Sequence, residues 1–496
     1  LLQPLHARRH VRRFVMGVVQ DRIGGRDAER GHQNQRQREP VAMAFDCRRQ
    51  HPPRGNRLSF ALGPRRHKLR VYTGRIAKKK RMSELDAQLD ELRKRMAEVS
   101  ARVALELEAR LAQRPESLHT RLDEVVPGRE VHTPLGVHFE FERHWEPFRR
   151  HGNMEISHLA GLPPDLLAGI SEGALPAAPP ESWAFLDTET TGLAGGSGTC
   201  AFLVGIGRIT RQGFTVRQFF MRDYPEEASM LAAIEEALTD VQVLVTYNGK
   251  TFDLPLLESR YRLARARPPF DSIPHLDLLY GARRLWRLRF ESCRLVELET
   301  RILGFERHGD VPGDLIPQIF FDYVRTGRAL RLAPVFEHNA LDIVTLACLT
   351  GVVPWAFQSS GAAQLAHGAE LVSLGRWLRQ LGRLEEVRDL FRRAIASHIS
   401  DQLLFRTMWD LAEVEKKLDA YDAALAVYTD LAAEPNPFRV AALEELAKHY
   451  EHRERNYSIA LDLTEQACAL ALTPELDRRR NRLRRRVTTP QTARLL

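Results

Sequence analysis

The chain has 496 residues, more than one hydrophobic core usually organises, so its length predicts two or three folded units plus some poorly ordered sequence. No run of about 18 uncharged apolar residues appears, which argues against a membrane-spanning helix. The five cysteines are widely spaced and form no Cys-x-x-Cys pair, which fits reduced thiols and disfavours a thiolate zinc site. These features predict a cytoplasmic protein without membrane contact.

The formal net charge of +9 is concentrated at one end of the chain. Residues 1–81 hold 22 Lys and Arg against 5 Asp and Glu, and the remaining residues hold 51 against 59. One interpretation of 1–81 is a disordered basic arm that binds phosphates by charge. Because the chain opens with Leu1 and Met82 directly precedes a helical pattern, we favour the other interpretation, upstream sequence translated from a misplaced start. We therefore infer no function from this segment.

A helix is predicted directly after the basic segment. Over residues 82–114 the apolar positions recur every three or four residues, as in an amphipathic or coiled-coil helix. Residues 82–111 could mediate self-association, or they could pack on the protein's own body.

The next stretch, 115–180, is expected to be a small hairpin followed by a linker. Apolar residues alternate between Pro127 and Trp145, which predicts a hairpin that adjoins the next domain. The segment from Gly161 to Pro180 holds five prolines and reads as a linker. The following domain is therefore expected to begin at residue 181.

Residues 181–355 carry the pattern of an α/β domain, because short apolar strand runs are mixed with helical patterns. The predicted strands are Trp183–Leu186, Ala201–Ile206, Phe214–Met221 and Val241–Tyr247, and the predicted helices are Glu226–Leu238 and the stretch from Asp342 to Trp355.

From about Leu365 no strand signal appears, and three segments resemble one another. They begin at Leu384, Tyr421 and Tyr457, at offsets of 37 and 36 residues. Such periods with paired amphipathic helices resemble tetratricopeptide repeats. We therefore expect tetratricopeptide-like repeats over 365–485 that recruit or orient a protein partner, with a plain helical bundle as the alternative.

Two residues of the α/β domain introduce candidate metal chemistry. Phosphodiester cleavage can use two divalent ions about 4 Å apart, and Mg²⁺ or Mn²⁺ requires oxygen ligands from several chain segments. Asp187 and Glu189 lie two apart at the end of a predicted strand, so both side chains leave one face. Asp253 follows a strand and a turn, where a helix N-cap is the alternative explanation.

His338 and Asp342 complete the candidate set. They are four residues apart, so on a helix they lie one turn apart on the same face. A histidine with an ordinary pKa near 6.5 can accept a proton at neutral pH, which is the general-base role we assign to His338. A hydrogen-bonded core histidine is the alternative.

The order Asp-x-Glu, Asn-x-x-x-Phe-Asp and His-x-x-x-Asp resembles the four-carboxylate (DEDD) superfamily of 3′–5′ exonucleases. The stretches DTETTGLAGGSGTCAFLVGIG, YNGKTFDLPLLESR, HLDLLYGARRLW and HNALDIVTL resemble the YprB-like ribonuclease H-like family. The resemblance covers roughly residues 181–353. It implies a ribonuclease H-like fold with a central mixed sheet.

By the same resemblance, Asp187, Glu189, Asp253 and Asp342 bind two Mg²⁺ or Mn²⁺ ions, and His338 stands at the base position. One departure concerns spacing, since three residues separate His338 from Asp342, as in the tyrosine subclass, whereas the histidine subclass usually has four.

Further residues near these motifs are weaker candidates for substrate contact. Thr190 and Asn248 could touch nucleic acid, and Asn248 could equally make a turn. Asp277 could contact substrate or cap a helix. Four arginines could meet phosphates or form a solvated face: Arg283, Arg284, Arg287 and Arg289.

These observations predict a two-metal nuclease acting on DNA or RNA, as a 3′–5′ exonuclease on a single-stranded end. Two alternatives stay open. One is a catalytically silent nucleic-acid-binding scaffold that works through its repeats. The other is an endonuclease on the same fold, because carboxylate ligands fix the reaction but not the polarity.

Overall fold

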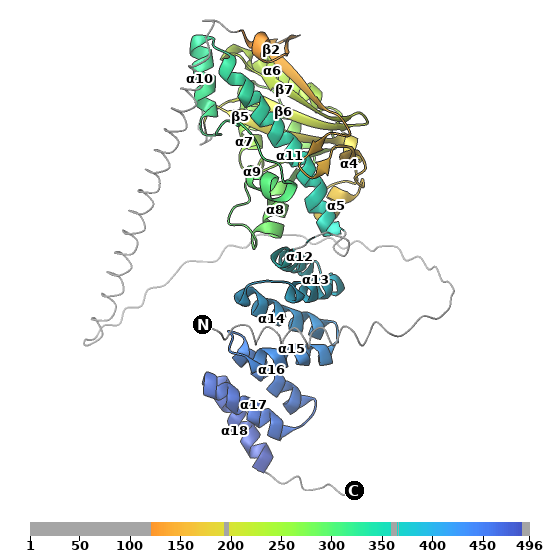
Figure 1. Cartoon of the computed structure of the whole chain (residues 1–496), viewed down its shortest axis with the longest axis vertical. Coiled ribbons are helices and arrows are strands. Elements are labelled where there is room, and N and C mark those ends of the chain that lie inside the picture. Colours follow the sequence, from red (N-terminus) through yellow and green to blue (C-terminus); the bar gives the residue numbers. More distant parts are fainter. Residues whose placement is uncertain (1–120, 193–197, 359–364, 366, 489–496) are drawn as a thin grey trace, which may run out of the picture. The chain divides into compact units, whose positions relative to one another are not determined.

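A computed structural model of the chain describes residues 121–192, 198–358, 365 and 367–488 (Figure 1). The predicted basic arm, 1–81, and the predicted helix, 82–114, lie outside the described residues. The described part comprises an α/β domain, residues 121–358, followed by a helical region, residues 368–488.

A mixed sheet of seven strands forms the centre of the α/β domain, in the order β1-β2-β7-β6-β5-β8-β9. β5 runs parallel to β8, and β8 runs parallel to β9, whereas the other neighbouring pairs are antiparallel. The predicted mixed sheet and its four predicted strands are confirmed. The strands are β1 (Arg129–Thr133), β2 (Gly136–Trp145), β5 (Trp183–Thr190), β6 (Ala201–Thr210), β7 (Gly213–Phe220), β8 (Val243–Thr246) and β9 (His275–Asp277).

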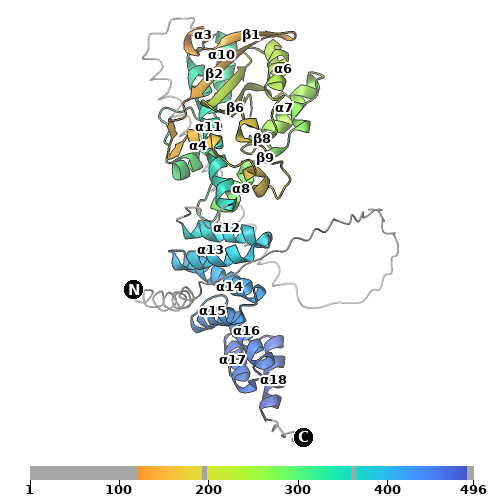
Figure 2. The ribbon, with the colours of Figure 1, turned by 90° about the vertical axis from the view of Figure 1, so that its right-hand side faces the viewer.

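Helices cover both faces of the sheet, and successive residues of β5 alternate between them. Trp183 and Phe185 pack in a core with α5, α8 and α11, whereas Ala184 and Leu186 pack in a core with α6, α7 and α10. Helix α11 crosses one face in Figure 1, and α6 and α7 lie on the opposite side in Figure 2. The helices of this domain are α3 (Leu122–Val125), α4 (Ser157–Ala160), α5 (Leu166–Ile170), α6 (Glu227–Ala237), α7 (Asp253–Leu263), α8 (Leu278–Trp286), α9 (Leu295–Leu298), α10 (Ile316–Thr326) and α11 (Ala333–Gln358).

Residues 121–180, the described part of the expected hairpin and linker, belong to the α/β domain. β2 pairs with β7 from Phe139 to Trp145, so the hairpin extends the main sheet. An isolated hairpin is marginal in water, and the third strand supplies the pairing that it lacks. In the proline-rich segment, Leu166 and Leu167 of α5 are buried in the core shared with α11. The prolines therefore separate short packed helices, and the main sheet includes strands that precede residue 181.

The helical region consists of consecutive helices, each packed on the next. The three similar sequence segments begin at the first residues of α13, α15 and α17, so each sequence repeat corresponds to one helix pair. The all-helical architecture is confirmed, and its assignment to tetratricopeptide-like repeats stays a prediction. The helices are α12 (Gly368–Gln380), α13 (Leu384–Ala396), α14 (Asp401–Lys417), α15 (Tyr421–Ala433), α16 (Arg439–His452), α17 (Tyr457–Leu470) and α18 (Pro474–Thr488).

Helix α12 packs on α8 of the α/β domain. The guanidinium of Arg284 lies 5.1 Å from the ring centre of Trp377, and Arg289 donates a 2.6 Å hydrogen bond to Glu370. Two of the four arginines considered for phosphate binding therefore contact α12 instead. This arrangement joins the helical region to the α/β domain through one continuous apolar core.

Among the described residues, one helical stretch, Leu330–Phe357, is long and apolar enough by composition to cross a membrane. However, 83% of its most apolar window is buried inside the protein. A central core helix meets the same criteria, and α11 occupies that position against the sheet.

Candidate metal centre

Asp187 and Glu189 lie near the end of β5 and have the same strand parity as Phe185, which faces α11. β8 pairs with β5 only as far as Phe185, so the following part of that strand edge is open. Asp187 itself lies opposite Gly205 of β6. The open edge allows side chains from other elements to reach the two carboxylates.

Helix α11 approaches the sheet closely at this level because β6 presents a glycine. A Cβ atom at Gly205 would lie 2.3 Å from Oδ1 of Asn339 and 2.3 Å from Cδ1 of Ile343. Real Cβ atoms do not make contacts this short. The glycine therefore permits the helix to lie directly beside Asp187.

Asn339 connects α11 to β5. Its Nδ2 donates a 2.9 Å hydrogen bond to Oδ2 of Asp187, and its Oδ1 accepts a 2.8 Å bond from Nε2 of Gln218. Asp342 lies three residues further along the same helix and so on a neighbouring part of its surface. The sequence analysis missed Asn339, although a buried amide on an apolar helix was a signal that it has a polar partner.

Asp253 reaches β5 from α7, on the other face of the sheet. Thr188, which lies between Asp187 and Glu189, donates a 2.6 Å hydrogen bond to Oδ1 of Asp253. Asp253 is the first residue of α7, whose N-cap is Phe252, and no side-chain cap bond is formed there. The helix-cap explanation of Asp253 therefore does not hold, and its carboxylate instead lies beside the strand.

The carboxylates are close enough to influence one another's ionisation. Burial raises the pKa of Asp187 well above its usual value, and the charges of the other three candidate carboxylates raise it further. Burial also raises the pKa of Glu189 to about 8; His338 opposes this rise, and Asp342 and Asp253 add to it. The pKa of Asp253 rises to about 6 because of burial, despite its hydrogen bonds. Burial is the largest cause in each case, so the ionised forms of these three carboxyl groups are disfavoured unless positive charge is added.

The donor set suits a hard divalent cation, because carboxylate oxygens are the ligands that Mg²⁺ and Mn²⁺ prefer and a cation would offset this charge. In the conformation described, no three His, Cys, Asp or Glu side chains among the described residues are set to hold one ion. Repulsion between uncompensated carboxylates is a physical reason for this looser arrangement. The chemistry of these carboxylates thus fits a hard divalent cation.

His338 lies beside the carboxylates, with its Nδ1 2.8 Å from Oδ1 of Asp310 and its Nε2 3.8 Å from Oδ2 of Asp342. Burial lowers the pKa of His338, but the hydrogen bond that it donates to Asp310 and the nearby charges of Asp342 and Glu189 outweigh this effect and raise the pKa to about 9. In the metal-free protein His338 is therefore protonated at neutral pH. This differs from the neutral histidine assumed from the sequence, because the surrounding carboxylates stabilise the charged imidazole.

Arg307 and Asp310 are two further members of the centre that the sequence analysis missed. Arg307 donates a 2.5 Å hydrogen bond to Oδ1 of Asp342, and Asp310 contacts His338. Both residues lie between Leu303 and α10, outside any long helix or strand. No periodic pattern marks such positions, and only the fold brings them to the carboxylates.

The weaker candidates make structural contacts. Asp277 is 3% exposed, and its carboxylate accepts hydrogen bonds from the backbone amides of Asn248, Lys250 and Leu279 at 2.8, 3.1 and 3.1 Å. It therefore caps α8 and fixes the preceding turn, in which Asn248 has a left-handed φ of 70°. Thr190 donates a 3.0 Å bond to the carbonyl of Gly192. Substrate contact by these residues stays a prediction.

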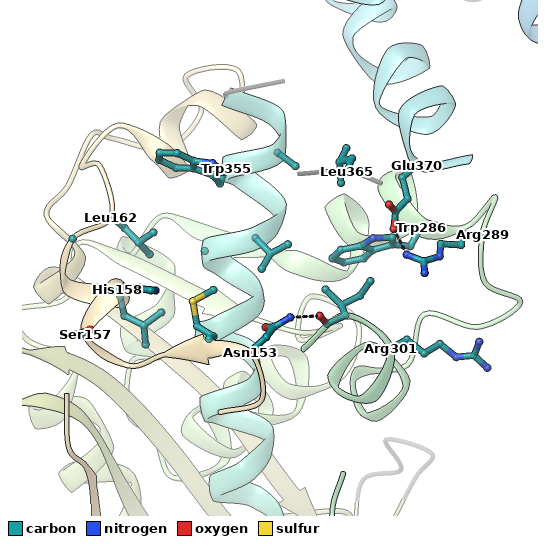
Figure 3. Close-up of a pocket in the computed structure, with 17 residues that line it drawn as sticks. Asn153, Ser157, His158, Leu162, Trp286, Arg289, Arg301, Trp355, Leu365 and Glu370 are labelled. Carbon is teal, nitrogen blue, oxygen red and sulfur yellow. Dashed lines mark hydrogen bonds and ion pairs between the residues drawn. The ribbon is translucent and has the colours of Figure 1, made fainter. Parts of the chain in front are cut away.

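A pocket of about 920 Å³ lies apart from the carboxylates (Figure 3). Its lining includes Trp286 of α8, Trp355 near the end of α11 and Glu370 of α12. Neither His338 nor any of the four candidate carboxylates lines it. The pocket therefore belongs to the junction with the helical region, and the candidate chemistry lies nearer the beginning of α11.

Comparison with known proteins agrees with this architecture. The family model described as RNase_H superfamily matches residues 184–353, which contain α7 and most of β5 and α11. A protein of Bacillus subtilis (strain 168), described as uncharacterized protein YprB, is 33% identical over 287 residues, covering 57% of this chain and 68% of YprB. A ribonuclease H-like domain indicates a nuclease that binds nucleic acid. The chain therefore belongs to the YprB family of ribonuclease H-like proteins.

Proposed function

We propose that this protein is a divalent-metal-dependent nuclease that hydrolyses phosphodiester bonds as a 3′–5′ exonuclease. The observation that carries the proposal is the approach of Asp187, Glu189, Asp253 and Asp342 from β5, α7 and α11, together with the raised pKa values of Asp187, Glu189 and Asp253. A buried group of carboxylates without matching cations is costly unless something positive offsets it. Two Mg²⁺ or Mn²⁺ ions supply that charge.

Each residue of the centre has a distinct role in this proposal. Asp187, Glu189, Asp253 and Asp342 would hold the ions, which supply the positive charge that stabilises the attacking and leaving oxygens. Asn339 orients Asp187 through its 2.9 Å hydrogen bond, and Thr188 orients Asp253 through its 2.6 Å bond.

His338 is the proposed general base. It can accept a proton from the attacking water only in its neutral form, so the negative charge around it has to be offset first. Asp342 and Glu189, whose charges help to raise the pKa of His338, are proposed to hold the ions, so a loaded centre would lower that pKa, while the hydrogen bond to Asp310 would still raise it. Proton acceptance and metal loading are therefore coupled.

The 3′–5′ polarity and a single-stranded nucleic-acid end as substrate rest on the resemblance to four-carboxylate exonucleases. We further propose that the helical region carries tetratricopeptide-like repeats that bind a protein partner. The correspondence between the sequence period and the helix pairs α12–α13, α14–α15 and α16–α17 supports this second part.

The direct test is cleavage by the purified full chain. DNA and RNA substrates, single- and double-stranded, labelled at either end or circular, are incubated with and without Mn²⁺. A 3′–5′ exonuclease gives a ladder of shortening products from 5′-labelled linear strands, releases mononucleotides from 3′-labelled strands and leaves circles intact. Cutting of circles would instead establish an endonuclease.

The matched variants are Asp187→Asn and Asp271→Asn. Asp271 is exposed and belongs to the same domain, so its loss should leave cleavage unchanged. Loss of one metal ligand should lower kcat by at least about a hundredfold, since ligands and ions act as a unit. Cleavage by Asp187→Asn at the parent rate would exclude this centre, and Mn²⁺ binding without cleavage of any substrate would favour the silent scaffold.

A further inference from the structure

A buried ion-pair network lies directly behind the candidate metal centre, and Arg307 is at its middle. The side chain of Arg307 is 4% exposed and contacts three carboxylates. Its Nε donates to Glu299 at 2.6 Å, its Nη1 to Asp310 at 3.2 Å and its Nη2 to Asp342 at 2.5 Å. One guanidinium thus connects the protein interior to a proposed metal ligand.

Glu299 anchors the network from the interior. Its side chain is fully buried, and it also accepts hydrogen bonds from the hydroxyl of Thr345 and from His151, whose Nε2 lies 3.2 Å away. Thr345 lies on α11, three residues after Asp342. Glu299 therefore holds Arg307 through two nitrogens, Nε at 2.6 Å and Nη2 at 3.2 Å, and the rigid planar fork has little freedom to turn.

Asp310 connects the same arginine to His338. Oδ1 of Asp310 lies 2.8 Å from Nδ1 of His338 and accepts a 2.9 Å bond from the amide of Val311, while Oδ2 accepts the bond from Arg307. An ionised carboxylate only accepts hydrogen bonds, so Nδ1 of His338 carries the proton toward Asp310. Nε2 of His338 consequently faces Asp342.

A tight turn brings both side chains to the centre. Gly309, between them, has a φ of 76°, in the left-handed region that glycine adopts without strain. A buried ion-pair network of this kind is weak evidence for stability, because desolvation of the charges cancels much of the attraction. The geometry of the network is better explained by the orientation that Arg307 and Asp310 impose on Asp342 and His338.

We propose that Arg307 and Asp310 are positioning residues of the nuclease centre, Arg307 for the ligand Asp342 and Asp310 for the base His338. The proposal rests on the proposed function, and it assigns different consequences to the two residues. Loss of the Arg307 geometry misorients a ligand and weakens metal binding. Loss of the Asp310 carboxylate frees the imidazole and slows turnover while the ligands keep their places.

The experiment uses the full chain with Arg307→Lys and Asp310→Asn, and it measures Mn²⁺ affinity from free Mn²⁺ by electron paramagnetic resonance, kcat, and the unfolding temperature. Arg307→Lys keeps the charge but loses the fork that contacts three carboxylates at once. We expect Mn²⁺ affinity to fall about tenfold in Arg307→Lys, a typical effect of altering a group that orients a ligand. In Asp310→Asn, kcat should fall about tenfold or more with Mn²⁺ affinity nearly unchanged, and Asp310→Glu should restore part of the rate.

Two additional variants keep the test decisive. Arg307→Met combined with Glu299→Gln removes the arginine without leaving a buried unpaired carboxylate, and it should weaken Mn²⁺ binding as Arg307→Lys does. Arg392→Met removes a 2.6 Å ion pair to buried Glu415 in the helical region, and it should change neither Mn²⁺ affinity nor kcat.

Parent-like Mn²⁺ affinity in both Arg307 variants, or parent-like kcat in Asp310→Asn, overturns the corresponding assignment. The positioning role is overturned altogether if Mn²⁺ affinity and kcat fall together in every variant, in proportion to a lowered unfolding temperature. Failure of the proposed function looks different, because the parent would then cleave no substrate. The Mn²⁺ affinities of the Arg307 variants would still test the arginine's role.

Discussion

The side-chain amide of Asn339 donates a 2.9 Å hydrogen bond to Oδ2 of Asp187, and this contact joins α11, the longest helix of the α/β domain, to strand β5. The two residues are 152 positions apart in the chain. Asn339 is fully buried, and its remaining oxygen is occupied by Gln218. The amide of Asn339 therefore orients Asp187, a proposed metal ligand, and at the same time fixes how closely α11 packs on the sheet.

Replacing Asn339 with leucine should destabilise the protein. The change keeps the volume but removes the donor to Asp187 and leaves a buried amide of Gln218 with one partner fewer. A lost hydrogen bond to a charged group costs roughly 1.5–3 kcal/mol, so the free energy of unfolding in urea at pH 8 should fall by about that amount. Asn481→Leu alters an exposed amide on α18 and serves as the control. If Asn339→Leu and the parent have equal free energies of unfolding, the hydrogen bond from Asn339 to Asp187 does not stabilise the protein.

Replacing Gly205 with alanine should displace α11. The new Cβ would lie 2.3 Å from atoms of Asn339 and Ile343, so helix or strand has to move, at a cost of about 1–3 kcal/mol. Nuclease activity should fall with stability, because Asp342 moves with the helix. Gly313→Ala is the matched control, since a Cβ there meets nothing within 4 Å. Unchanged activity and stability in Gly205→Ala would show that the helix does not approach as closely as described.

Stability should depend on pH through Glu189. Burial raises its folded-state pKa to about 8, so its ionisation opposes folding. This penalty is absent below about pH 4, where the folded and unfolded forms are both protonated, and it is complete above about pH 8. Without metal, Glu189→Gln should therefore equal the parent at pH 4 and exceed it by several kcal/mol at pH 8 in urea unfolding.

Adding Mn²⁺ at pH 8 should reverse that order, because a bound ion stabilises only the parent by mass action. Asp430→Asn is the matched control. Burial alone raises the pKa of Asp430 to about 6, so its replacement should also stabilise the protein at pH 8. That gain should be unaffected by Mn²⁺, since Asp430 lies on α15 in the helical region. A parent that gains no stability from Mn²⁺ would count against the metal centre.

Replacing Trp377 with alanine should uncouple the helical region from the α/β domain. Trp377 is 4% exposed, with its ring centre 4.7 Å from that of Phe357 and 5.1 Å from the guanidinium of Arg284. Truncating a buried tryptophan costs about 3–5 kcal/mol of folding free energy. Here the lost contacts are those between α12 and the α/β domain. Calorimetry should show one unfolding transition for the parent and two for Trp377→Ala. Trp355→Ala, at a 43% exposed position, should unfold like the parent.

Much of the candidate centre was predictable because its residues stand in locally recognisable places. Asp187 and Glu189 follow an apolar run with strand periodicity, and His338 and Asp342 have the spacing of one helical turn. Asn339, Arg307 and Asp310 were not predictable in the same way. One is a single amide within a helical pattern and the other two lie in a loop, so nothing near them in the sequence identifies their partners.

Taken alone, the sequence determined the β1–β2 hairpin, strands β5 to β8, helix α6 and much of α11, the helical repeat period and the acidic motifs, because each depends on hydrophobic periodicity and on residue types within a few positions. Only the tertiary structure decided that the β1–β2 hairpin extends the main sheet, that α5 is packed rather than a linker, and that His338 is surrounded by enough negative charge to be protonated. The physical reason is that strand pairing, burial and electrostatic interactions join residues far apart in the chain, whose partners local patterns do not specify.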